Sequence, residues 1–222
     1  MRALFLLLLA PALLTGCISY GVGTTAATNP AGERTMTVMA EATPAPDSTA
    51  ACNDQIRDCA FQGVVIPMIS SEVRIGLSDR SDWGVRLIGY TGAVFTYKRR
   101  LTAPDARLQA AVIGGGGLLN AFQTASGEAT LLLSGPEGGA VPYGGARVQV
   151  TTPLSSAQNQ RQDRPTAGVF FGTRFGSRDF GISPEIGVHY DPSVRKLYER
   201  TIVVVPVVSF HGSGVLERLF GL

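Results

Sequence analysis

Hydrophobic and polar side chains alternate along several stretches of this chain. Within residues 64–77, Val73 and Ile75 alternate with Glu72 and Arg74. Successive side chains of an extended backbone point to opposite faces, so this stretch has one apolar and one polar face. The same period of two recurs in residues 83–89, 92–101, 144–153, 166–176 and 180–191. The pattern is typical of β-strands with one apolar face.

Turn-forming residues separate the alternating stretches, for example in Ser78–Asp82 and Gly176–Asp179. We predict ten strands, at residues 33–42, 64–77, 83–89, 92–101, 106–118, 127–135, 144–153, 166–176, 180–191 and 200–211. Short connections between consecutive strands favour antiparallel neighbours. The expected fold is therefore all-β, an antiparallel up-and-down β-barrel of about ten strands over residues 33–212.

Two architectures fit this alternation. A soluble barrel or sandwich turns its apolar face inward, whereas a transmembrane barrel turns it toward lipid and pairs its charges inside the lumen. Glycines on the charged face, such as Gly76, Gly84 and Gly172, favour the second, because a narrow lumen needs small residues beside paired ions. The stretch 200–211 is apolar on both faces and contains Pro206, which suggests a buried strand with a bulge or an irregular edge.

The charge content is low and the net charge is small. Charged residues make up 16% of the 222 residues, below the ~25% of a typical soluble domain, and the net charge is +2. No electrostatic argument supports nucleic-acid binding. The only histidines, His189 and His211, are far from the cysteines in sequence, so we expect no metal site and no cofactor.

The N-terminus has the features of an export signal. Residues 3–14 are uncharged, follow Arg2, and are too few to span a bilayer as a helix. The next residues, Leu14-Thr15-Gly16-Cys17, resemble the lipobox of bacterial lipoprotein precursors. The alternative is an ordinary signal peptide with an incidental cysteine.

The lipobox resemblance implies that residues 1–16 are a signal peptide and that Cys17 is acylated, with palmitate as a suitable label. Outer-membrane lipids are then the partner, reached through the acyl anchor, because Ile18 replaces the Asp that tends to retain such proteins in the inner membrane. Residues 17–32 are small and polar and predict a flexible tether. With the lipid in the inner leaflet, the chain should enter the first strand from the periplasm, on the side of its anchor.

Two further cysteines, Cys52 and Cys59, lie close together in a stretch rich in Pro, Ala, Asp and Ser. Because export leads to an oxidising compartment, we expect them to form a disulfide. The C-terminal residues 213–222 predict a short tail with one or two amphipathic turns.

Candidate chemistry is sparse, and we expect no catalytic residues. The run Gly114–Gly117 lacks the Lys-Ser/Thr of a phosphate-binding loop and predicts a flexible strand end or bulge. Glu185 and His189 share one strand face, either as a proton-handling or ligand-binding pair, or, as we favour, in a structural network with Arg174. The full set of expected lumen residues is Glu72, Arg74, Arg86, Arg174, Glu185 and His189.

One hairpin carries a second resemblance. The sequence RIGLSDRSDWGVRL is similar to hairpins of small outer-membrane β-barrel proteins, in which Gly-aliphatic strands flank an Asp-Arg turn. This resemblance implies an envelope barrel and no activity. We therefore expect a lipid-anchored outer-membrane β-barrel, non-enzymatic, with a structural or narrow-pore role. The alternative is a periplasm-facing lipoprotein whose soluble barrel or sandwich binds an apolar ligand.

Overall fold

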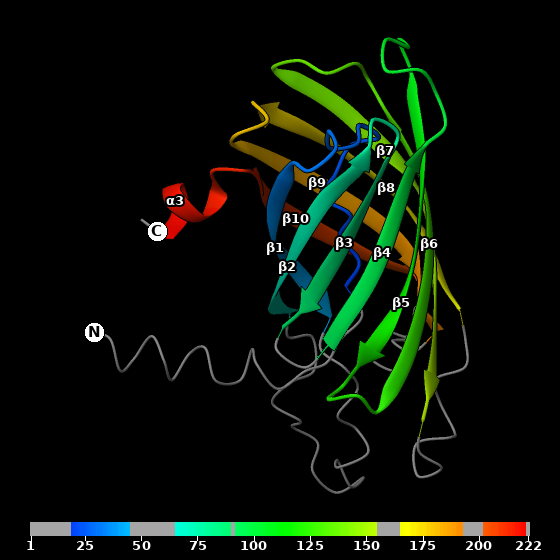
Figure 1. Cartoon of the computed structure of the whole chain (residues 1–222). Helices are drawn as coiled ribbons and strands as arrows, with labels where there is room; N and C mark the ends of the chain where they lie inside the picture. Colours follow the sequence, from blue (N-terminus) through cyan, green and yellow to red (C-terminus); the bar gives the residue numbers. More distant parts are fainter. Residues whose placement is uncertain (1–18, 45–64, 90–91, 155–164, 193–201, 221–222) are drawn as a thin grey trace, which may run out of the picture.

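The computed structural model describes residues 19–44, 65–89, 92–154, 165–192 and 202–220. They form one closed barrel of ten antiparallel strands, in which each strand pairs with its neighbours in sequence and β1 pairs with β10 (Figure 1). The strands are β1 (Arg34–Pro44), β2 (Val65–Ser78), β3 (Ser81–Ile88), β4 (Gly92–Arg100), β5 (Gln109–Leu119), β6 (Thr124–Ser134), β7 (Ala140–Pro153), β8 (Thr166–Gly176), β9 (Gly181–Tyr190) and β10 (Ile202–Gly212). The predicted all-β up-and-down barrel is confirmed.

The sequence predicted that the glycine run 114–117 forms a flexible strand end or a bulge, and the structure shows neither. The run lies inside β5 and pairs with β4 and β6 on both sides. A Cβ on Gly117 would come within 2.0 Å of the carbonyl oxygen of Ala93, whereas a Cβ on Gly114 would meet nothing within 4 Å. A Cβ on Gly115 would likewise approach the carbonyl oxygen of Phe95 to 2.6 Å, so Gly115 and Gly117 allow β4 and β5 to lie close together.

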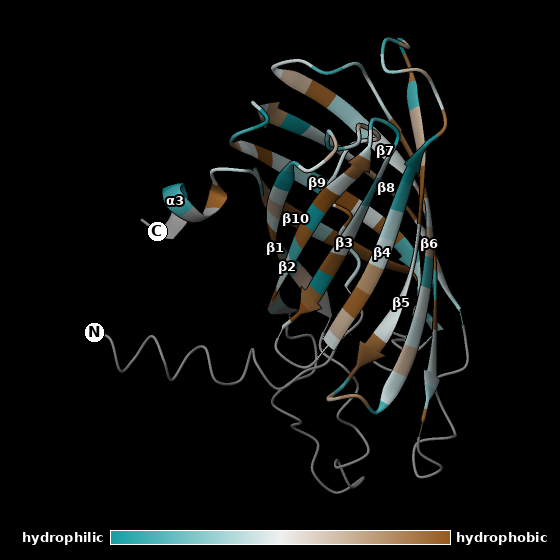
Figure 2. Ribbon diagram, viewed as in Figure 1, coloured by the Kyte–Doolittle hydropathy of each residue, from teal (hydrophilic) through white to brown (hydrophobic). Residues whose placement is uncertain are grey.

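Hydrophobic and hydrophilic residues alternate along the strands (Figure 2). Most outward side chains are apolar, and nearly all charged side chains of the described strands point into the barrel. The side chains of Phe95 and Phe171 point outward and are 62% and 61% exposed. Glu72 and Arg86, on neighbouring strands, point inward and are each 1% exposed. The distribution is the reverse of that in a water-soluble barrel, which hides its apolar side chains.

The outer surface carries almost no charge. Among the outward side chains that the structure describes on its strands, only those of Arg34 and Arg99 are charged. Arg34 begins β1 and Arg99 lies near the end of β4, so both lie close to the same mouth of the barrel. The rest of the outer wall is an uninterrupted uncharged band.

The two mouths of the barrel differ. The links β2–β3, β4–β5, β6–β7 and β8–β9 lie at one mouth, which we call the turn end, and the other links lie at the opposite mouth, the loop end. The strand ends at the loop end are joined by the three longest intervals between consecutive strands, residues 45–64, 154–165 and 191–201. After β10, a short helix, α3 (Val215–Phe220), follows at the turn end. Among the described residues, no helix is long and apolar enough to cross a membrane.

Residues 19–33, which we call the lumen segment, run through the inside of the barrel before β1 begins (Figure 1, dark blue). At the loop end, Tyr20 donates a hydrogen bond from its hydroxyl to Asp191, just beyond β9. At the turn end, the hydroxyl of Thr28 donates to the carbonyl of Asp79, 2.8 Å away, in the β2–β3 turn. The lumen segment therefore spans the barrel from mouth to mouth.

This path corrects one expectation. The flexible tether predicted for residues 17–32 is wrong for residues 19–30, because they are packed in the lumen rather than extended outside it. Ser19 lies at the loop end and Arg34 at the turn end, at opposite mouths. The expected entry into the first strand from the periplasm stays a prediction, because Cys17 lies outside the described residues.

Candidate functional site

One wall of the lumen carries a chain of ion pairs. Nη1 of Arg74 lies 2.6 Å from Oε1 of Glu72, and Nη2 of Arg74 lies 2.6 Å from Oδ1 of Asp82. Arg86 continues the chain, with nitrogens 3.5 Å from Glu72 and 3.7 Å from Glu128. These side chains project inward from β2, β3 and β6, where the period of two puts every second residue in the lumen.

Arg147 of β7 extends the chain by pairing with Glu128. All these ions are almost fully buried, and an isolated ion there would be very unfavourable. Positive and negative side chains alternate along the wall, and the attraction between them offsets that cost. The cluster is therefore a cross-link between strands that are distant in sequence.

On another wall, two carboxylates bind the backbone of the lumen segment. Oε2 of Glu41 accepts hydrogen bonds from the amides of Tyr20 and Gly21, at 2.7 and 3.0 Å. Glu185 accepts the next two amides, those of Val22 and Gly23, each at 3.0 Å. Within the described part of the chain, neither carboxylate forms an ion pair. Hydrogen bonds from four consecutive backbone amides stabilise the two carboxylates instead.

Cations of the first wall bind carbonyls of the same segment. Nη1 of Arg147 donates to the carbonyl of Gly21 at 2.8 Å, and Nζ of Lys98 donates to that of Thr25 at 3.1 Å. Carboxylates thus bind backbone donors and cations bind backbone acceptors. The backbone of the lumen segment is held from both sides by charge-assisted hydrogen bonds.

Apolar contacts hold the lumen segment as well. Tyr20 packs with Met39 and with three inward valines of β10, Val203, Val205 and Val207. This contact explains why β10 is apolar on both faces. Farther along, Val22 and Ala26 pack in a second cluster, with Ala111, Ile113, Leu132, Tyr143 and Phe170.

The sequence predicted a bulge or an irregular edge around Pro206. No bulge occurs on the β9 side, where β10 pairs in continuous register from Ile202 to His211, but an irregular edge lies on the β1 side. Pro206 points outward. The ladder between β1 and β10 ends at the pair Glu41 and Val207, directly before this proline. A residue without an N–H is tolerated where a ladder stops.

All six residues expected in the lumen point into it, but their partners differ from the expectation. Glu72, Arg74 and Arg86 lie together in the ion-pair chain. Glu185 binds the lumen segment, whereas Arg174 lies 2.6 Å from Glu137, so the expected network of Glu185 and His189 with Arg174 is wrong. His189 instead lies against Tyr20, with ring centroids 4.9 Å apart.

Sequence reasoning missed several of the lumen residues that matter most. Glu41, Asp82 and Arg147 all follow the inward parity of their strands, and that parity was the available signal. Their roles depend on the lumen segment or on other strands. Cys17, Cys52 and Cys59 lie outside the described residues. No cluster of metal-ligating side chains occurs in the described ranges.

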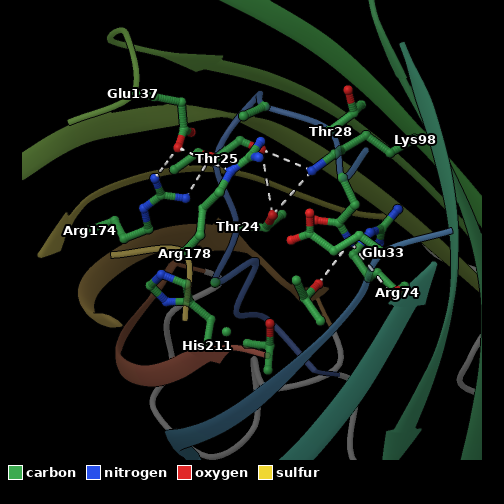
Figure 3. Close-up of a pocket in the computed structure, with 16 residues that line it drawn as sticks. Thr24, Thr25, Thr28, Glu33, Arg74, Lys98, Glu137, Arg174, Arg178 and His211 are labelled. Atoms are coloured by element: carbon green, nitrogen blue, oxygen red, sulfur yellow. Dashed lines mark hydrogen bonds and ion pairs between the residues drawn. The ribbon is translucent and has the colours of Figure 1, made fainter. Parts of the chain in front are cut away.

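A polar cavity opens between the lumen segment and the wall at the turn end (Figure 3). Thr24, Thr25 and Thr28 of the lumen segment line one side. The wall contributes charged and polar side chains from β2, β4, β8 and β10 and from the turns, namely Arg74, Lys98, Glu137, Arg174, Arg178 and His211. Cations outnumber carboxylates in this lining.

Comparison of the chain with protein-family models, with curated proteins and with solved structures finds no match.

Proposed function

We propose that this protein is a lipid-anchored outer-membrane β-barrel with a structural role and no catalysis. The observation that carries the proposal is the apolar outer wall around a charged, filled lumen. A lipid-facing wall needs uncharged side chains and a closed sheet without free edges, because the bilayer core offers no water to backbone or ions. A tilted strand needs ~9–11 residues to span a bilayer, and every described strand except β3 has 9 to 14 residues, whereas β3 has 8.

The contents of the lumen favour a structural role over an open pore. The lumen segment runs from mouth to mouth and is bound by Glu41, Glu185, Lys98 and Arg147. The same contents argue against a soluble barrel that binds an apolar ligand. Such a ligand needs an open apolar interior, whereas many buried charges line the inside here and residues of the lumen segment pack in two of the interior apolar clusters.

The decisive experiment separates the barrel from the lipid anchor. In Cys17→Ser, the anchor is lost, but the barrel should stay in the membrane fraction after urea extraction. It should also migrate differently in gels with and without boiling. Release of this variant into aqueous buffer would contradict a membrane-spanning barrel. Incorporation of labelled palmitate should disappear in Cys17→Ser, and retention of the label there would contradict the anchor at Cys17.

A further inference from the structure

We propose that the cavity at the turn end binds a small oxyanion, of the chemical class of inorganic phosphate. Figure 3 shows the residues that line this cavity. Lys98 and Arg174 lie there on opposite sides of Thr24 and Thr25. The proposal is independent of the bilayer, because it concerns only groups that face the lumen.

The charge balance of the cavity favours an anion. Arg74, Lys98, Arg174 and Arg178 line it, against two carboxylates, Glu33 and Glu137. Arg74 is neutralised by Glu72 and Asp82, each 2.6 Å away. The positive charges of Lys98, Arg174 and Arg178 are less fully neutralised by nearby carboxylates.

Arg174 and Arg178 share a single carboxylate. Nη2 of Arg174 lies 2.6 Å from Oε2 of Glu137, and Nε of Arg178 lies 3.9 Å from the same oxygen. The side chain of Glu137 is 35% exposed in the β6–β7 turn. An oxyanion entering from the mouth would therefore compete with Glu137 for two guanidinium groups.

Unused hydrogen-bonding capacity points to the same ligand. The side chain of Arg174 is nine-tenths buried, and its Nε has no hydrogen-bond partner among the described residues. Nζ of Lys98 lies 3.7 Å from Asp82 and, within the described ranges, donates only to Thr24 and Thr25. A planar guanidinium with a free N–H, a lysine and nearby threonine hydroxyls are the groups that proteins use to bind phosphate.

The experiment is a calorimetric titration of the full-length protein, in a non-ionic detergent, with inorganic phosphate at constant ionic strength. Arg174→Gln and Lys98→Gln should weaken binding about tenfold each, since each removes a charge-assisted contact. Arg99→Gln is the matched control. It removes the same charge one residue from Lys98, but on the outer wall, and should bind phosphate like the wild type.

Glu137→Gln provides the sharper test, because it should strengthen phosphate binding several-fold by removing the competing carboxylate. Loss of a merely structural ion pair would not increase affinity. Gel mobility before and after boiling shows that each variant is folded. Absence of phosphate binding, or equal affinities in Glu137→Gln, Arg174→Gln and the wild type, would overturn the proposal.

A parallel titration with glycerol phosphate distinguishes a free anion from a lipid headgroup. Equal or tighter binding of inorganic phosphate supports the free oxyanion, whereas binding of glycerol phosphate alone overturns it.

Discussion

Successive residues of one strand of this barrel alternate between two environments, the outer surface and the lumen. In β4, Phe95 faces outward and is 62% exposed. Its immediate neighbours Val94 and Thr96, and Lys98 farther along, face the lumen and are buried. In the proposed bilayer, Phe95→Arg should cost about 2–4 kcal/mol in unfolding free energy, because it puts a charge near the middle of the lipid-facing wall. Urea unfolding in liposomes measures this cost.

Leu108→Arg is the control for that substitution. Leu108 is 60% exposed but lies in the β4–β5 link, outside the strands. The same change should cost less than about 0.5 kcal/mol, as is usual at an exposed surface position. Equal effects at the two positions would indicate that Phe95 faces water.

The glycine run of β5 allows a second comparison at the residue scale. Gly117→Ala should destabilise the barrel by about 1–3 kcal/mol, because the added Cβ overlaps the backbone of β4 at Ala93. Gly114→Ala has open space and should be neutral or slightly stabilising, through a less flexible unfolded chain. Unfolding free energies in the same detergent test the pair, and equal values would contradict the close approach.

Parity along each strand was enough to predict which residues face the lumen, but it could not assign their partners. Arg86 meets Glu128 because β3 and β6, which are separated by β4 and β5 in the closed wall, both turn these side chains into the lumen. Glu41 was missed because its carboxylate pairs with backbone amides rather than with a charged residue. No pattern of side chains in the sequence marks such a partner.

At the scale of elements, the strands were predictable and the lumen segment was not. Strand ends agreed to within a few residues because turn-forming residues mark them, as at Ser78–Asp82. Small polar residues without periodicity are typical of linkers, and residues 19–33 have that composition. The same small side chains also fit a narrow lumen, where a Cβ on Gly21 would already approach Val207 to 2.9 Å.

The attachment of the lumen segment can be tested one carboxylate at a time. Glu185→Gln replaces charge-assisted hydrogen bonds to the amides of Val22 and Gly23 with weaker neutral ones. Hydrogen exchange at these two amides should accelerate about tenfold, corresponding to ~1.4 kcal/mol of lost protection. Exchange within β9 should not change.

Glu137→Gln is the matched control, since it makes the same chemical change at the turn end, away from both amides. If it accelerated exchange at Val22 and Gly23 as much as Glu185→Gln does, the effect would not arise from the hydrogen bonds of Glu185.

At the scale of the whole molecule, the filled lumen predicts that the intact protein conducts poorly. In planar bilayers the wild type should show little ionic current. The double variant Glu41→Gln/Glu185→Gln loosens four consecutive backbone contacts of the lumen segment and should show more frequent or larger current steps. A wild-type current as large as that of the double variant would show that the segment does not block the lumen.

The path of the lumen segment also constrains the order in which the molecule is assembled. The chain before Ser19 joins the segment at the loop end, while β1 leaves it at the turn end. A barrel that closed first would have to draw its own N-terminal region through a lumen lined by fixed ion pairs. It is simpler for the strands to wrap around the segment and for the six residue pairs between β1 and β10 to form last. The lumen segment would then act as a template around which the strands close. Its later withdrawal from the lumen would require breaking its contacts with the wall.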